Sequence, residues 1–192
     1  MRPDVVIIGV GNPYRRDDGI GPAVIHRLRA AGLPGVTLAE SDGETGALIL
    51  LWQRRRLAIL IDAIHADPPH PGRIHRLVTP WPQTGSRTAA STHATDPGEA
   101  ITLGAVLGRL PEQLVVYAVE ASDTGFGAHL SPEVAAAADL VAEQVAAEAR
   151  AVIQPSGTKD PARPPPVRGQ WRGEARPAGS MSIAWPDDPE EA

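Results

Sequence analysis

Residues Val5–Gly21 read VVIIGVGNPYRRDDGIG, and the prediction of the fold starts from this segment. Its β-branched apolar run, Val5–Val10, predicts a buried strand. A glycine turn follows, and the next residues, Gly21–Ala31, show the apolar spacing of a helix with Pro22 in its first turn. A strand, a glycine turn and a helix in this order are typical of an α/β fold. Two adjacent acids in the turn need an explanation, because they repel the phosphates that such turns often bind.

The same alternation of strand and helix patterns continues along the chain and predicts a mostly parallel sheet covered by helices. The Pro-rich loop at 63–72 is shorter than a parallel crossover normally needs, so we expect the fourth strand to be antiparallel. Besides those in the opening stretch, we predict strands at Val36–Glu40, Leu57–Ile61, Arg73–Val78 and Leu114–Val119, and helices at Thr45–Gln53, Pro97–Leu107 and Ser131–Val152.

Composition excludes several classes of protein. The net charge is −5 over 192 residues, without a basic stripe, so we expect no nucleic-acid partner. No apolar run reaches membrane-spanning length and no signal-peptide pattern is present, so we expect a cytoplasmic protein with no membrane association. The chain has no cysteine, so a metal site would have to use histidine and carboxylates.

The composition changes near residue 154. Residues 155–192 are rich in proline, glycine and charge, with few periodic apolar positions. Such a segment buries too little apolar surface to offset the entropy lost on ordering. We therefore predict one domain at 1–154 and a mostly disordered tail at 155–192.

Three groups of polar residues follow predicted strands or precede a helix. They are Asp17 with Asp18 after the first strand, Asp62 after the third, and His93 in the segment STHATDP. Taken singly, each has an ordinary explanation: a helix cap, a loop carboxylate bonded to backbone, and a hydrogen-bonded loop histidine. Taken together at the carboxyl edge of a sheet, they match the ligand types of a divalent cation site with open positions.

Other site motifs fail on particular residues. Tyr14 stands where a dinucleotide fingerprint needs its third glycine, and the turn lacks the lysine of a P-loop. Asp123-Thr124-Gly125 matches the aspartic-protease tripeptide, but that chemistry needs two carboxylates sharing a proton, and no second copy occurs. We therefore interpret Asp123 as part of a flexible loop.

The motifs GVGNPYRRDDGIG, DGETG, LIDAI and STH…GEAITLGAVLGRLP, in this order, resemble those of the hydrogenase maturation endopeptidases. The resemblance spans Val5 to about Val152. It implies a three-layer α/β/α sandwich with a five-stranded, mostly parallel mixed sheet whose fourth strand is antiparallel. It also implies metal contacts by Asp18, Asp62 and His93.

This family removes a C-terminal peptide from the large-subunit precursor of [NiFe] hydrogenase after nickel insertion. The resemblance therefore implies an endopeptidase with that precursor as partner and with nickel supplied by the precursor. In the second motif, Asp42, Gly43 and Thr45 would contact the substrate. Asp17 would be the helix-capping acid of the pair. We expect a monomer.

Two other functions are compatible with some of these residues. A non-catalytic chaperone that senses the nickel-loaded precursor could use the same three ligands. A sugar- or nucleoside-processing hydrolase could use a similar sheet, but no phosphate or ribose motif supports it.

Overall fold

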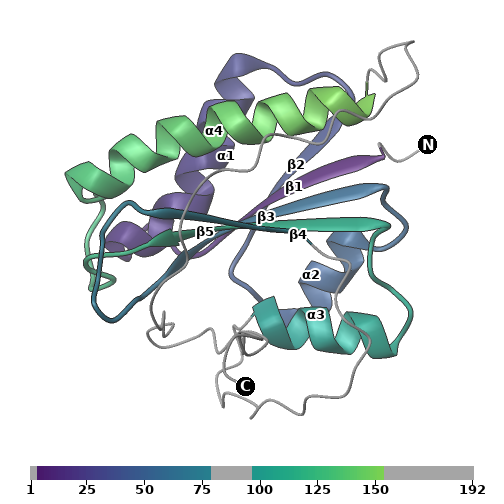
Figure 1. Ribbon diagram of the computed structural model, residues 1–192, viewed down its shortest axis with the longest axis horizontal. Coiled ribbons are helices and arrows are strands. Elements are labelled where there is room, and N and C mark those ends of the chain that lie inside the picture. Colours follow the sequence, from purple (N-terminus) through teal and green to yellow (C-terminus); the bar gives the residue numbers. More distant parts are fainter. Residues whose placement is uncertain (1–3, 79–96, 154–192) are drawn as a thin grey trace, which may run out of the picture.

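The computed structural model describes residues 4–78 and 97–153, which form one α/β unit (Figure 1). The predicted element order is confirmed, with a short 3-10 helix, η1, added in the first turn. The elements are β1 (Val5–Val10), η1 (Arg16–Gly19), α1 (Ile20–Ala31), β2 (Val36–Ser41), α2 (Thr45–Trp52), β3 (Leu57–Ile64), β4 (Ile74–Val78), α3 (Pro97–Val106), β5 (Gln113–Glu120) and α4 (Pro132–Ile153).

The sheet has the strand order β2-β1-β3-β5-β4. The first four strands in this order are parallel, and β4 runs antiparallel to β5, with Ile74 opposite Val119. The predicted antiparallel fourth strand is therefore confirmed. The link between β3 and β4 is too short to carry a crossover helix, so the chain can only turn back on itself.

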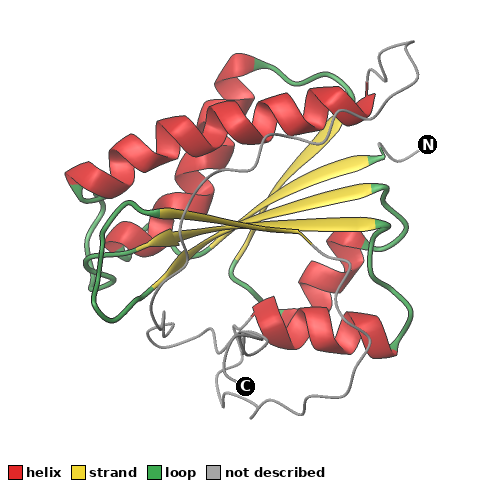
Figure 2. Ribbon diagram, viewed as in Figure 1, coloured by secondary structure: helices red, strands yellow, loops and turns green. Residues whose placement is uncertain are grey.

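Helices cover both faces of the sheet, which confirms the three-layer sandwich (Figures 1 and 2). Alternate strand residues point to opposite faces. Ile7, Ile59 and Tyr117 therefore pack toward α1 and α4, whereas Ile8 and Leu60 pack toward α2 and α3. Because both faces are covered, the central strands are apolar along nearly their whole length.

Two glycines bring β1 and α1 into unusually close contact. A Cβ atom on Gly9 would lie 2.3 Å from the carbonyl oxygen of Gly21, and a Cβ on Gly21 would lie 2.3 Å from that of Val10. No side chain fits at these separations. The glycines of the opening motif therefore serve strand–helix packing and fix where the turn between them begins and ends.

The predicted bounds differ from the observed ones mainly at β3. The sequence predicts a strand ending at Ile61, but β3 continues to Ile64, so Asp62 lies inside the strand rather than after it. The pattern misplaces this end because a charged residue usually marks a loop. None of the helices in the described ranges is long and apolar enough to cross a lipid bilayer. The tail predicted at 155–192 lies outside the described residues.

Candidate functional site

The turn after β1 holds Asp18 by its own backbone. The Asp18 Oδ2 atom accepts a hydrogen bond of 2.9 Å from the backbone N–H of Asn12. Gly11 makes the turn possible: its φ is +122°, and a Cβ there would lie 1.9 Å from the Asp18 carbonyl oxygen. Asp18 is half-buried, and its Oδ1 atom accepts no hydrogen bond from a described residue. One carboxylate oxygen is therefore fixed, and the other is available to a ligand.

Asp62 lies at the same edge of the sheet. It is buried in β3 opposite Ala118 of β5, and its Oδ1 accepts 2.9 Å from the N–H of Ala63. In the pairing of β1 with β3, Gly9 lies opposite Ile61, so Asp62 is level with the last residue of β1. The structure thus brings both predicted acids to the carboxyl end of neighbouring central strands, where sites in open α/β sheets form.

The third predicted ligand, His93, lies outside the described residues. Within residues 4–78 and 97–153, no three histidine, aspartate or glutamate side chains form a group that could hold a metal ion. Asp18 and Asp62 alone do not make a metal centre. The donor set that the sequence predicts therefore depends on a residue from the segment between β4 and α3.

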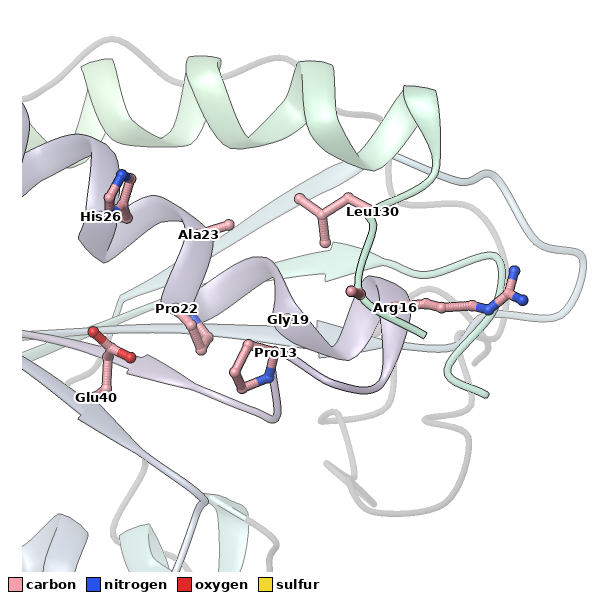
Figure 3. A pocket seen from close by; sticks show the side chains of 9 residues that line it. Pro13, Arg16, Gly19, Pro22, Ala23, His26, Glu40 and Leu130 are labelled. Atoms are coloured by element: carbon pink, nitrogen blue, oxygen red, sulfur yellow. The ribbon is translucent and has the colours of Figure 1, made fainter. Parts of the chain in front are cut away.

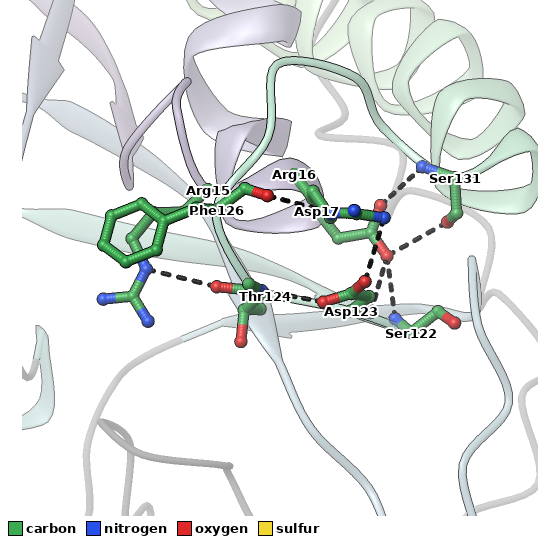
Figure 4. A network of polar contacts seen from close by, with 9 residues as sticks. Arg15, Arg16, Asp17, Ser122, Asp123, Thr124, Phe126 and Ser131 are labelled. Carbon is green, nitrogen blue, oxygen red and sulfur yellow. Dashed lines mark hydrogen bonds and ion pairs between the residues drawn. The ribbon is translucent and has the colours of Figure 1, made fainter.

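Asp17 has a role that the sequence does not predict. We expected it to cap the helix that follows, but the residue before α1 is Gly19 and no side chain caps that end. Instead, the buried Asp17 carboxylate accepts four hydrogen bonds from the loop between β5 and α4 (Figure 4). Its donors are Ser131 N (2.6 Å), Ser131 Oγ (3.0 Å), Ser122 N (2.9 Å) and Asp123 N (3.1 Å).

The ionisation of Asp17 follows from these contacts. Burial opposes the charge, but the hydrogen bonds from Ser131, Asp123 and Ser122 together outweigh it and lower the pKa of the carboxyl group. Asp17 is therefore a buried anion at neutral pH. It joins the first turn to the residues just before α4. The bond that it accepts from Ser131 N lies at the start of α4, so Asp17 supports the start of α4 and not that of α1.

His65 is a polar residue of this edge that sequence reasoning missed. It directly follows β3, three residues after Asp62, and its Nε2 lies 3.3 Å from Thr124 Oγ1. Burial lowers the pKa of His65, although the charges of Asp17, Asp18 and Asp123 partly counteract this. The charges of Asp17, Asp18 and Asp123 act on His65, which places its imidazole near the candidate site. No sequence motif distinguishes His65 from an ordinary loop histidine.

The second predicted loop, between β2 and α2, lies beside the first. The N–H of Gly11 donates to the Ser41 carbonyl oxygen at 3.0 Å, which joins the two loops. Asp42 is exposed, and its Oδ1 accepts from Glu44 N at 3.2 Å. Gly43 has φ +90°. The substrate contacts predicted for Asp42, Gly43 and Thr45, which begins α2, stay predictions.

The Glu44 side chain caps α2. Its two carboxylate oxygens accept from Gly46 N at 2.9 Å and from Ala47 N at 2.6 Å. A carboxylate at this position also interacts favourably with the positive end of the helix dipole. The loop therefore enters α2 in a fixed conformation.

A separate open cavity of about 290 Å³ lies between the first turn, α1 and the loop before α4 (Figure 3). It contains neither Asp18 nor Asp62. Its lining is partly apolar and includes three charged or titratable side chains, those of Arg16, His26 and Glu40. The lining residues are Pro13, Arg16, Gly19, Pro22, Ala23, His26, Glu40, Ala128 and Leu130.

Comparisons with known proteins agree on one family. The family model described as hydrogenase maturation protease (HycI) matches residues 24–148. The hydrogenase expression/formation protein HupD of Thiocapsa roseopersicina is 26% identical over 136 residues, covering 69% of this chain. The matched region spans 61% of the length of that relative.

Solved structures show the same fold. The hydrogenase maturating endopeptidase HybD from E. coli superposes with a TM-score of 0.64 and 24% identity, covering 79% of this chain and 94% of that one. The [NiFe] hydrogenase maturation protease HycI from Thermococcus kodakarensis superposes with a TM-score of 0.56 and 25% identity, covering 76% and 92%.

Proposed function

Since the chain belongs to the hydrogenase maturation protease family, we propose that it is an endopeptidase that removes the C-terminal peptide of a [NiFe] hydrogenase large-subunit precursor. The observation that carries this proposal is the family match over residues 24–148, which includes most of the described fold. The placement of Asp18 and Asp62 at one edge of the sheet supports it, because sites in open α/β sheets form at the carboxyl ends of the strands.

We further propose that nickel is part of the substrate. The chain has no cysteine, so it lacks the soft thiolate ligands of a closed nickel site. Asp18, Asp62 and His93 are the residues that would contact an ion carried by the precursor. Such an ion would supply Lewis-acid polarisation of the scissile carbonyl group or of a water molecule. The two carboxylates would bind and orient the loaded precursor, which makes the metal a specificity signal.

Incubation of the purified protein with nickel-loaded and nickel-free precursor tests both parts of the proposal. The mass of the large subunit should fall only for the loaded precursor. Association without a change in mass would favour the chaperone alternative. A precursor whose cysteine ligands are mutated should stay uncleaved when Ni²⁺ is added to the protease. Its efficient cleavage would overturn the shared-ion proposal and indicate an autonomous metallopeptidase.

Asp18→Asn should abolish cleavage of loaded precursor, because it removes a negative charge from the proposed contact with the ion. The protein should stay folded, because Asp18 is half-exposed. Asp139→Asn is the matched control. Asp139 is an exposed acid of α4 paired with Arg27 on the surface, so its loss should leave cleavage unchanged. Equal cleavage rates for both variants would remove Asp18 from the site.

A further inference from the structure

Two loops expose aromatic side chains next to the candidate site. Tyr14, in the first turn, is 74% exposed, and Phe126, in the loop between β5 and α4, is 88% exposed. The chain contains only two tyrosines and one phenylalanine, and two of these three residues are exposed in loops joined by a backbone hydrogen bond from Gly127 N–H to the Tyr14 carbonyl oxygen. A single exposed apolar residue needs no explanation, but neighbouring exposed aromatics are typical of binding surfaces.

Backbone hydrogen bonds fix these two loops to each other. The N–H of Gly127 donates to the Tyr14 carbonyl oxygen at 2.9 Å, and the N–H of Arg16 donates to the Gly127 carbonyl oxygen at 2.9 Å. The buried Asp17 carboxylate, with its four donors, holds the base of the same pair of loops. The aromatic groups are therefore presented from a preformed backbone, which lowers the entropy lost when a partner binds.

Arg15 adds a positive charge to this surface. Its guanidinium group lies over the Phe126 ring, 6.0 Å from the ring centroid, and its Nε donates to the Thr124 carbonyl oxygen at 3.1 Å (Figure 4). Arg16 pairs with Asp123 at 3.1 Å, but Arg15 forms no ion pair with a residue in the described ranges. A partner carboxylate next to an apolar side chain would complement both the charge and the ring.

We infer that Tyr14, Arg15 and Phe126, here called the aromatic platform, dock a segment of the hydrogenase precursor in which apolar and acidic side chains adjoin. This inference rests on the proposed function. Its second support is continuity with the candidate site: the Asp18 N–H donates to the Arg15 carbonyl oxygen at 3.0 Å, within one turn of chain. A segment bound on the platform is thereby placed at a fixed position relative to Asp18.

The test measures steady-state cleavage of purified nickel-loaded precursor. The double variant Tyr14→Ala/Phe126→Ala should raise KM by about tenfold or more, which is the effect expected from truncating two interface aromatics. Its kcat at saturating precursor should stay within about twofold of wild type, since docking residues add binding that is equal in ground and transition states. Val106→Ala is the matched control, because Val106 is 79% exposed and is the last residue of α3, outside the two loops that carry the aromatic side chains.

The charge contribution is tested separately. Arg15→Glu should raise KM more than Arg15→Lys, and the difference should shrink at high salt because exposed charges are screened. Unchanged KM values in the double variant and in Arg15→Glu, with a wild type that cleaves, would overturn the platform and leave the proposed function intact. A fall in kcat with constant KM would also overturn docking. A wild type that neither binds nor cleaves the precursor would overturn the proposed function and the platform together.

Discussion

Asp17→Asn changes a buried carboxylate into an amide of nearly equal shape. The least costly orientation places the amide nitrogen at the Oδ1 position, where it faces the Ser131 N–H instead of accepting from it. One buried donor without a partner costs about 1–3 kcal/mol. The three bonds to Oδ2, from Ser122, Asp123 and the Ser131 hydroxyl, would persist but lose their charge, at a further cost of about 0.5 kcal/mol each. The expected loss is therefore about 3 kcal/mol in the free energy of unfolding.

Urea unfolding of wild type and Asp17→Asn at pH 7 measures this difference, provided that the two slopes agree. The adjacent Asp18→Asn is the control. Asp18 is half-exposed and accepts one backbone bond, which an asparagine oxygen can also accept, so its cost should stay below about 1 kcal/mol. A loss of less than about 1 kcal/mol for Asp17→Asn would refute the proposed link between the loops.

The pH dependence gives the same test a second readout. Because the pKa of Asp17 is lowered in the folded protein, its stabilising contribution is present above the unfolded value of about 4. This contribution is lost as the pH falls through the lower folded value. The stability difference between wild type and Asp17→Asn should therefore narrow below about pH 4. A difference that stays constant down to pH 2 would contradict an ionised Asp17.

Two further predictions concern residues outside the described ranges. Ni²⁺ binding to the protein alone should be weak and should weaken further in His93→Ala, as measured by calorimetry; identical isotherms would remove His93 from the proposed site. Deleting residues 155–192 should leave the melting temperature within about 2 °C of wild type, because the segment lacks periodic apolar positions, and a large drop would show that it packs on the domain.

Most of the fold was predictable because the central strands β1, β3 and β5 are buried along nearly their whole length, and α1 and α4 carry an apolar stripe. Such patterns are local, so Val5–Val10 could be bounded without knowledge of its neighbours. The end of β3 was not predictable in this way. In the sequence alone, Asp62 looks like a loop residue. The strand is seen to continue only because β3 pairs with β5 as far as Ile64, which lies opposite Glu120.

The candidate site was predictable only in part, for a related reason. Asp18 and Asp62 could be placed at one edge because both positions follow from strand direction. The role of Asp17 could not, since its donors Ser122, Asp123 and Ser131 lie more than a hundred residues further along the chain. His65 was missed because its significance comes from the surrounding acids and not from its own sequence context.

The two adjacent acids of the first turn have different surroundings because the 3-10 helix η1 points their side chains in different directions. A 3-10 helix has about three residues per turn, so consecutive side chains point roughly 120° apart. In η1 this turns Asp17 into the protein, where it is buried and accepts four hydrogen bonds. Asp18 stays half-exposed, and its Oδ1 atom accepts no hydrogen bond from residues 4–78 or 97–153. The buried acid fixes the loops around the exposed one. Exchanging their roles would require rotating the whole turn, which the close approach of Gly11 to the Asp18 backbone prevents. The pair is therefore one structural anion, Asp17, and one partly exposed carboxylate, Asp18, which under the proposed function would contact the cation.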